Sequence, residues 1–147
     1  MTNSRVLPTE REYIFIQSQR IARMATVDRS GKPLVLPICY AYDGTNLYTP
    51  IDKKPKSVSP GELKRIRNIT GNPNVSVLVD VYNEDWNEIG FIIIHGTAEV
   101  IDSGKEYRES LRILSEKYIQ YRQMNLSELG LPVIKISPNR IISWGKI

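Results

Sequence analysis

IARMATVDRSGKPLVLPICYAY, residues 21–42, is the stretch that decides the fold of this 147-residue chain. Two apolar runs with the composition of β-strands, residues 21–27 and 33–42, flank the polar turn DRSG. Gly31 provides the positive φ that such a turn requires. The next polar turn leads into a third apolar run at residues 47–51. Three strands joined by tight turns predict an antiparallel meander.

The remainder of the chain carries further strand and helix patterns. Strands are predicted at residues 74–81, 89–101, 133–137 and 140–144, with Gly96 as a bulge or bend. Helices are predicted from the capping box of Thr9 and Glu12 to about residue 19, over residues 61–70, and from residue 105 to about 122. No crossover helix alternates regularly with the strands, which argues against a doubly wound parallel sheet. We expect a mainly β protein, a small β-barrel of six or seven antiparallel strands with peripheral helices.

The composition limits the classes of protein that the chain can belong to. Its length fits one domain, and a hydrophobic fraction of 41% is sufficient for a core. No run of 18 apolar residues exists, and no apolar signal core follows the N-terminus, so we expect a cytoplasmic protein with no membrane partner. One cysteine, Cys39, and one histidine, His95, exclude an internal disulfide and the usual Cys/His metal cages.

The most informative chemical feature is a basic segment with six positive charges in fifteen residues: Lys53, Lys54, Lys56, Lys64, Arg65 and Arg67. Arginine makes forked contacts to phosphate, and lysine acts as a point charge. The free amides at the start of the predicted helix would add to an anion site. The segment therefore predicts either a site for a phosphate or polycarboxylate, or a solvated basic face.

Other candidate residues have two interpretations each. His95 alternates with isoleucines on a predicted strand, where a structural or interface role is more common than that of a general base. Trp86, in an acidic loop, either marks an interface or ring-stacking site or folds back on the barrel. Trp144 fits a core, dimer or ligand contact equally well. No nucleophile–base pair stands out, which fits a protein whose bound cofactor carries the chemistry.

Three segments resemble a known family. Residues 23–33 resemble the opening hairpin of the pyridoxamine 5′-phosphate oxidase-like split-barrel flavoproteins. Residues 63–76, LKRIRNITGNPNVS, resemble that family's K-x-x-N-L-x-x-N-P-x-V element. Residues 51–56 together with 79–86 are similar to a narrower group of the same fold, the probable coenzyme F420 (deazaflavin)-dependent enzymes.

The resemblance implies a fold and an assembly. The fold is a six-stranded antiparallel split β-barrel of the FMN-binding type, formed by a single domain over residues 1–147. Residues 1–19 would contain the N-terminal helix, and residues 20–147 the barrel with its inserted helices. The family forms homodimers that bind FMN or coenzyme F420 in two clefts between the subunits.

The resemblance also implies cofactor-binding residues. The cofactor phosphate, and the acidic tail of coenzyme F420, would be held by basic residues: Lys53, Lys54, Lys56, Arg65 and Arg67. The backbone beside the ring would be that of Thr49, Pro50, Ile51 and Asp52. Pro37, Ile38 and Cys39 would lie under or near the ring. Trp86 and Trp144 would close the pocket from the other subunit.

These expectations lead to a flavin- or deazaflavin-dependent oxidoreductase that transfers hydride between the cofactor ring and a small organic substrate. The extra lysines favour coenzyme F420 over FMN, and Tyr40 or Tyr48 is a candidate proton donor. Residues 139–147 lack the histidine of the pyridoxamine-phosphate oxidases, which argues against oxidation of vitamin B6. The alternatives are a non-catalytic barrel that binds or sequesters flavin or haem, and a single-strand nucleic-acid binder, which a net charge of only +4 disfavours.

Overall fold

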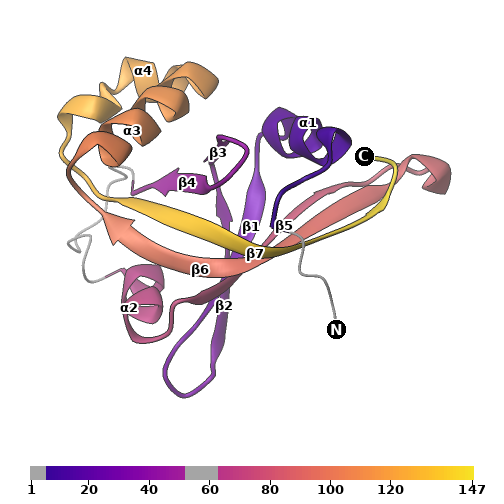
Figure 1. The fold of residues 1–147 in the computed structure, drawn as a ribbon, viewed down its shortest axis with the longest axis horizontal. Coiled ribbons are helices and arrows are strands. Elements are labelled where there is room, and N and C mark those ends of the chain that lie inside the picture. The colour runs from indigo at the N-terminus through magenta and orange to yellow at the C-terminus, as the bar shows by residue number, and fades with distance from the viewer. Residues whose placement is uncertain (1–5, 52–62) are drawn as a thin grey trace.

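A computed structural model describes residues 6–51 and 63–147. These residues form one curled antiparallel sheet with helices packed around it (Figure 1). The strands are β1 (Ala22–Val27), β2 (Pro33–Ile38), β3 (Ala41–Tyr42), β4 (Leu47–Pro50), β5 (Asn74–Val81), β6 (Gly90–Ile101) and β7 (Val133–Gly145). They are arranged in the order β2-β1-β5-β6-β7-β4-β3. The prediction of a mainly β split barrel with peripheral helices is confirmed.

The sheet closes through the corner between β2 and β3. These two strands lie at opposite ends of the strand order, yet only Cys39 and Tyr40 separate them in the chain. The strand predicted over residues 33–42 is therefore interrupted, and the sheet has seven strands rather than six. The interruption has a physical cause, because the backbone N–H of Tyr40 donates to the Tyr118 hydroxyl at 3.0 Å instead of to a strand.

The C-terminal part of the sheet also corrects the sequence prediction. Instead of two strands flanking Pro138 and Asn139, β7 is one strand with a bulge. His95 pairs with Arg140 and Gly96 pairs with Pro138, so Asn139 is the extra residue. The bulge at Gly96 is confirmed, and a Cβ there would lie 2.4 Å from the Ser137 carbonyl oxygen. The bulge accommodates a proline, which has no N–H to donate, inside a strand.

The helices follow the predicted order with one break. They are α1 (Glu10–Ser18), α2 (Lys64–Gly71), α3 (Lys105–Lys117) and α4 (Ile119–Gln123), with short 3-10 helices η2 (Trp86–Glu88) and η3 (Leu126–Glu128). The capping box of α1 is confirmed, because Thr9 and Glu12 bond each other's backbone amides at 2.8 and 3.2 Å. The helix predicted from residue 105 to about 122 breaks at Tyr118, which has an extended backbone. Positions 61 and 62 of the second predicted helix lie outside the described residues.

Two hydrophobic clusters hold the fold together. The larger cluster fills the concave side of the sheet, under α1 and α2, and contains Ile16, Met24, Ile92 and Ile94 at or below 1% exposure. The smaller cluster lies between the β3–β4 edge and helices α3 and α4.

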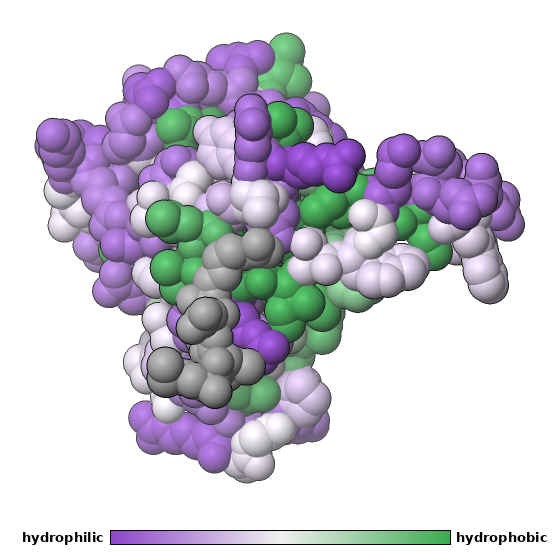
Figure 2. All heavy atoms as spheres, turned by 45° about the vertical axis from the view of Figure 1, so that its right-hand side comes forward, coloured by the Kyte–Doolittle hydropathy of each residue, from purple (hydrophilic) through white to green (hydrophobic). Residues whose placement is uncertain are grey.

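The ends of β5, β6 and β7 project from this body as an arm with η2 at its tip (Figure 1). Hydrophobic surface gathers where the arm meets the body (Figure 2). No helix in the described ranges is long and apolar enough to cross a membrane.

Candidate functional site

The candidate cofactor site is built around the place where the sheet splits. β3 and β4 pair only at Ala41 with Tyr48 and at Tyr42 with Leu47. Extending that register by two residues sets Cys39 across from Pro50, but the ladder does not continue. Segment 37–39 precedes the β3–β4 ladder and segment 49–51 follows it, so the two segments that we predicted to border the cofactor ring flank the point where this pairing stops. We call residues 37–39 and 49–51 the seam.

The side chains of the seam are mostly buried in the protein core. Ile38, Thr49 and Ile51 are all at or below 5% exposure, and Pro50 is also buried. Pro37 is exposed, and the free thiol of Cys39 is half-buried against the smaller hydrophobic cluster. The backbone N–H of Ile51 donates to the carbonyl of Pro132 at 3.0 Å, which holds the end of β4 against the start of β7. Past Tyr48, β4 is no longer paired with β3, whereas Thr49 and Pro50 remain paired with Ile134 and Val133 of β7.

Helix α2 places two predicted arginines on different faces. Ile66 and Ile69 anchor the helix in the larger cluster. Asn68 donates from Nδ2 to the buried Thr26 Oγ1 at 2.9 Å, so its side chain holds the helix against β1. Arg67 lines an open cavity with the turn after β1, whereas Arg65 is not among the residues that line it. Asp52, Lys53, Lys54 and Lys56 lie outside the described residues.

The two predicted tryptophans lie far from the seam of their own chain. Trp144 stacks on Phe91 with ring centroids 5.7 Å apart, and Trp86 is in η2, just before β6 begins. Trp86 is 73% exposed and Trp144 is 54% exposed, so neither folds back into the core. Pro50 pairs with Val133, at the other end of β7. The strand from Val133 to Trp144 spans roughly 35 Å at 3.2–3.4 Å per residue. One chain therefore does not bring the tryptophans to the seam.

The candidate proton donors Tyr40 and Tyr48 already have protein acceptors. The Tyr40 hydroxyl donates to the Ile16 carbonyl at 2.5 Å, and burial raises the pKa of Tyr40 above its usual range. The Tyr48 hydroxyl donates to Glu106 Oε2 at 2.7 Å. Burial, and then this hydrogen bond, raise the pKa of Tyr48 in the same way. Both hydroxyls keep their protons, and both tyrosine residues are 4% exposed or less.

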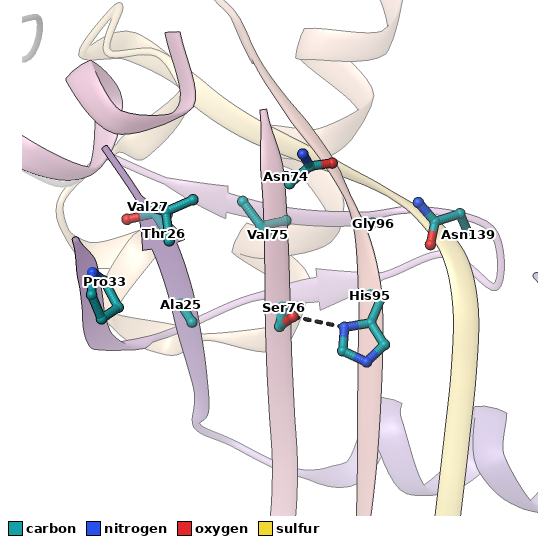
Figure 3. Close-up of a pocket in the computed structure, with 10 residues that line it drawn as sticks. All are labelled: Ala25, Thr26, Val27, Pro33, Asn74, Val75, Ser76, His95, Gly96 and Asn139. Carbon is teal, nitrogen blue, oxygen red and sulfur yellow. Dashed lines mark hydrogen bonds between the residues drawn. The ribbon is translucent and has the colours of Figure 1, made fainter. Parts of the chain in front are cut away.

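His95 lies on the outer face of the sheet. Its Nδ1 is 2.8 Å from Ser76 Oγ, on the neighbouring strand β5. The two residues border a cavity of about 380 Å³ that also includes Val75, Pro33 and Asn139 (Figure 3). The hydrogen bond orients the imidazole along the sheet surface, as expected of a structural or interface histidine.

Two residues of chemical interest were not predicted from the sequence. The Lys117 Nζ is buried and has no hydrogen-bond partner within residues 6–51 and 63–147. It lies 3.9 Å from the centre of the Tyr40 ring, and burial lowers the pKa of Lys117 to about 8. The second residue, Arg29, belongs to the turn after β1 and lines the same cavity as Arg67. No sequence signal indicates Lys117, because a lysine near the end of a helix is ordinarily solvated.

Solved structures with this fold include proteins of different activities. A conserved hypothetical protein from Mycobacterium tuberculosis superposes with a TM-score of 0.74 at 19% identity, covering 98% of this chain and 90% of that one. The haem storage protein HutZ from Vibrio cholerae superposes with a TM-score of 0.71 at 16% identity, covering 91% of each chain. At these identities the likeness demonstrates a shared split-barrel fold.

Sequence comparison identifies a related reductase and the family to which the chain belongs. The chain is 28% identical over 141 residues to a 5a,11a-dehydrotetracycline/5a,11a-dehydrooxytetracycline reductase from Streptomyces rimosus subsp. rimosus, covering 93% of this chain and 82% of that protein. Residues 9–145 match the family described as pyridoxamine 5′-phosphate oxidase. This match includes the opening hairpin, the seam, α2 and all of β7. The chain therefore belongs to the pyridoxamine 5′-phosphate oxidase family.

Proposed function

We propose that the protein is a reductase that uses a flavin or deazaflavin, coenzyme F420 in preference to FMN, to reduce a small unsaturated organic substrate. The observation that carries this proposal is the match to a reductase over 93% of the chain. Oxidation of pyridoxamine phosphate is the less favoured activity, because the C-terminal segment lacks the histidine expected for that substrate.

The described residues fit the proposed cofactor. The seam offers backbone beside side chains that are mostly buried, which suits a flat ring held by main-chain contacts. Arg65 lies in the first turn of α2, close in the chain to the basic residues Lys53, Lys54 and Lys56. We propose that these four cations hold the cofactor phosphate, with the lysines as point charges and Arg65 as a forked donor.

We further propose that the working form is a homodimer. Leu78, Ile93 and Ile142 lie directly across from one another on β5, β6 and β7. They are only half-buried, because their neighbours Ile92 and Ile94 point into the core and strand side chains alternate between faces. A second copy packed on this apolar outer face would bring its Trp86 and Trp144 toward the seam of the first. This arrangement supplies a ring-covering wall that one chain does not provide.

In this proposal the protein mainly positions and encloses the cofactor. The bound deazaflavin or flavin supplies the hydride. The cations hold the anionic end, the seam orients the ring plane through its backbone, and the partner's tryptophans exclude water. Tyr40 and Tyr48 keep their protons and are not assigned as donors, so we propose that the proton comes from solvent.

Cofactor binding to the purified, cofactor-free protein tests this function. Fluorescence titration should show tight, saturable binding of coenzyme F420 and weaker binding of FMN. The triple variant with Lys53, Lys54 and Lys56 changed to Ala, and the variant Arg65→Gln, should each lose at least about tenfold in affinity. Arg108→Gln, an exposed change on α3, is the matched control. If neither cofactor binds, or if no variant differs from the control, this proposal is wrong.

A second candidate function is non-catalytic binding of haem. It is supported by His95, which borders a cavity and is the only histidine in the chain, and by the fold shared with a haem storage protein. Titration with hemin should then give a Soret shift that His95→Ala abolishes. A hemin spectrum unchanged by that substitution excludes His95 as the haem ligand.

A further inference from the structure

A basic cavity lies between the turn after β1 and helix α2. It has a volume of about 510 Å³ and is lined by Asp28 and Arg29 from the turn and by Lys64, Arg67 and Gly71 from the helix. It therefore brings together charges that are more than thirty residues apart in the sequence. Arg65, which we assign to the cofactor phosphate, does not line it.

The charges around this cavity are not balanced. Three cations, Arg29, Lys64 and Arg67, face one carboxylate, that of Asp28. Lys64 Nζ lies 3.6 Å from Asp28 Oδ2. Neither Arg29 nor Arg67 forms a hydrogen bond or ion pair between side chains with any other residue in the described ranges. Like charges gathered around one cavity repel each other, so a bound anion would lower the energy of the arrangement.

The single carboxylate is already used by the turn. Asp28 Oδ1 accepts hydrogen bonds from Ser30 Oγ at 2.7 Å and from the backbone N–H groups of Ser30 and Lys32, both at 2.9 Å. The Ser30 hydroxyl, and then the Lys32 amide, lower the pKa of Asp28 to about 2. The carboxylate therefore stays ionised and remains directed into the turn, and the two guanidinium groups are not neutralised by it.

The two sides of the cavity are held in fixed positions. The buried hydrogen bond from Asn68 Nδ2 to Thr26 Oγ1, at 2.9 Å, ties the middle of α2 to β1 just before the turn. At the end of α2, a Cβ on Gly71 would lie 2.8 Å from Arg29 Nε. The Arg29 side chain thus lies across the glycine, and its position depends on the missing side chain. Preorganised donors lose little entropy when a ligand binds.

We propose that this cavity binds an oxyanion with two or more negative charges, of which a phosphate group is the simplest. Arg29 and Arg67 would make the forked contacts that guanidinium groups make with phosphate or carboxylate oxygens, and Lys64 would add a point charge. The site is separate from the proposed cofactor anchor, because it includes the β1–β2 turn and excludes Arg65. The oxyanion comes either from a separate phosphate compound or from the acidic tail of a bound cofactor.

Titration with inorganic phosphate, at constant ionic strength maintained with chloride, tests the site in the full-length protein. Amide resonances of Ser30, Gly31 and Gly71 should shift together and saturate. Arg29→Gln and Arg67→Gln should each weaken the binding by at least about tenfold. The control Arg108→Gln should leave it unchanged, and circular dichroism should show that all three variants are folded.

Shifts that do not saturate, or an affinity that is the same in Arg29→Gln, would overturn the proposal. The variant with Lys53, Lys54 and Lys56 changed to Ala keeps this test independent of the proposed function. It should lose cofactor binding, and phosphate should still shift its Gly71 amide resonance. A second titration uses protein already loaded with coenzyme F420. Continued phosphate binding indicates a separate ligand. A block that appears with coenzyme F420, but not with FMN, identifies the acidic tail of coenzyme F420 as the occupant. Either result supports an oxyanion site and names its source.

Discussion

The hydroxyl of Tyr118 accepts a hydrogen bond from the backbone N–H of Tyr40 at 3.0 Å, and so joins the break between α3 and α4 to the corner between β2 and β3. The same hydroxyl donates to the Arg20 carbonyl at 2.9 Å, with the Tyr40 carbonyl 3.1 Å away. One side chain therefore connects three segments that meet where the sheet closes.

Replacing Tyr118 with Phe removes this connection and leaves a buried backbone N–H without its acceptor. We expect the free energy of unfolding to fall by about 1–3 kcal/mol, measured by urea denaturation. Tyr82→Phe is the control, since Tyr82 is 68% exposed and its hydroxyl donates to Glu84 Oε2 at 3.3 Å on the protein surface. If the two variants have equal stability, the Tyr118 hydroxyl does not hold the corner.

The bulge opposite Asn139 should not tolerate a side chain at Gly96. Gly96→Ala places a methyl group against the backbone of β7, which is unable to move as a flexible side chain would. We expect a loss of about 1–3 kcal/mol in unfolding free energy, as is typical of overpacking. Thr97→Val, at the exposed neighbouring position, should change stability little. A stable Gly96→Ala protein would contradict the close approach of the two strands.

Lys117 should make the free energy of unfolding depend on pH at alkaline pH. Its pKa is about 8 in the folded protein, below the ordinary lysine value of 10.5. Between these values the unfolded chain binds a proton that the folded protein has released, so unfolding free energy should rise as pH increases from about 8. Above about pH 10 the titration of tyrosines in the unfolded chain opposes this trend, because Tyr40 and Tyr118 have raised pKa values when folded.

The measurement for this prediction is urea denaturation of the wild type and Lys117→Met between pH 7 and about pH 9.5. The wild type should gain stability relative to the variant across the upper part of this range. Parallel pH profiles would show that the Lys117 ammonium keeps its proton next to the Tyr40 ring.

The proposed dimer predicts a specific sensitivity to charge on the outer face of β6. Ile93→Glu places a carboxylate in the middle of the half-buried row, opposite Leu78 and Ile142. We expect a folded monomer with at least about tenfold weaker cofactor binding, measured by light scattering and fluorescence. Val100→Glu, on the same strand at an exposed position, is the matched control. A monomeric wild-type protein would remove the basis for this prediction.

Local sequence patterns predicted the elements whose determinants are local. The DRSG turn forms with Gly31 at φ +87°, and the Thr9–Glu12 box begins α1 as expected. Three breaks differ from the prediction, at residues 39–40, at Tyr118 and at residues 138–139, because their causes lie elsewhere in the chain. Helical periodicity continues through Tyr118, but the helix breaks there, where the Tyr118 hydroxyl bonds the backbone of Tyr40 and Arg20. Likewise Pro138 and Asn139 resemble a strand end unless β6 is alongside to accommodate a bulge.

The candidate site depends on how distant segments pack, which local patterns do not specify. The placement of segments 37–39 and 49–51 beside a cofactor ring is implied by the resemblance to the family and stays a prediction. Arg65 and Arg67 are two residues apart, so a helix necessarily directs them to different faces. The sequence does not indicate that Arg67 faces the turn containing Arg29, because that contact depends on how α2 docks on β1.

The strand order also has a consequence for how the protein is made. In the sheet, β4 pairs with β7, which lies between β6 and β4. More than eighty residues separate β4 from β7 in the chain, so β4 cannot pair with β7 until all of them have left the ribosome. Until then the edge of β4 is exposed, and the corner at Tyr40 has no Tyr118 to hold it. Closure is therefore a late, long-range event, and contacts of that kind slow folding and leave strand edges open to other chains. In the nascent chain, the part that must wait longest for its partners is the same seam that is proposed to hold the cofactor.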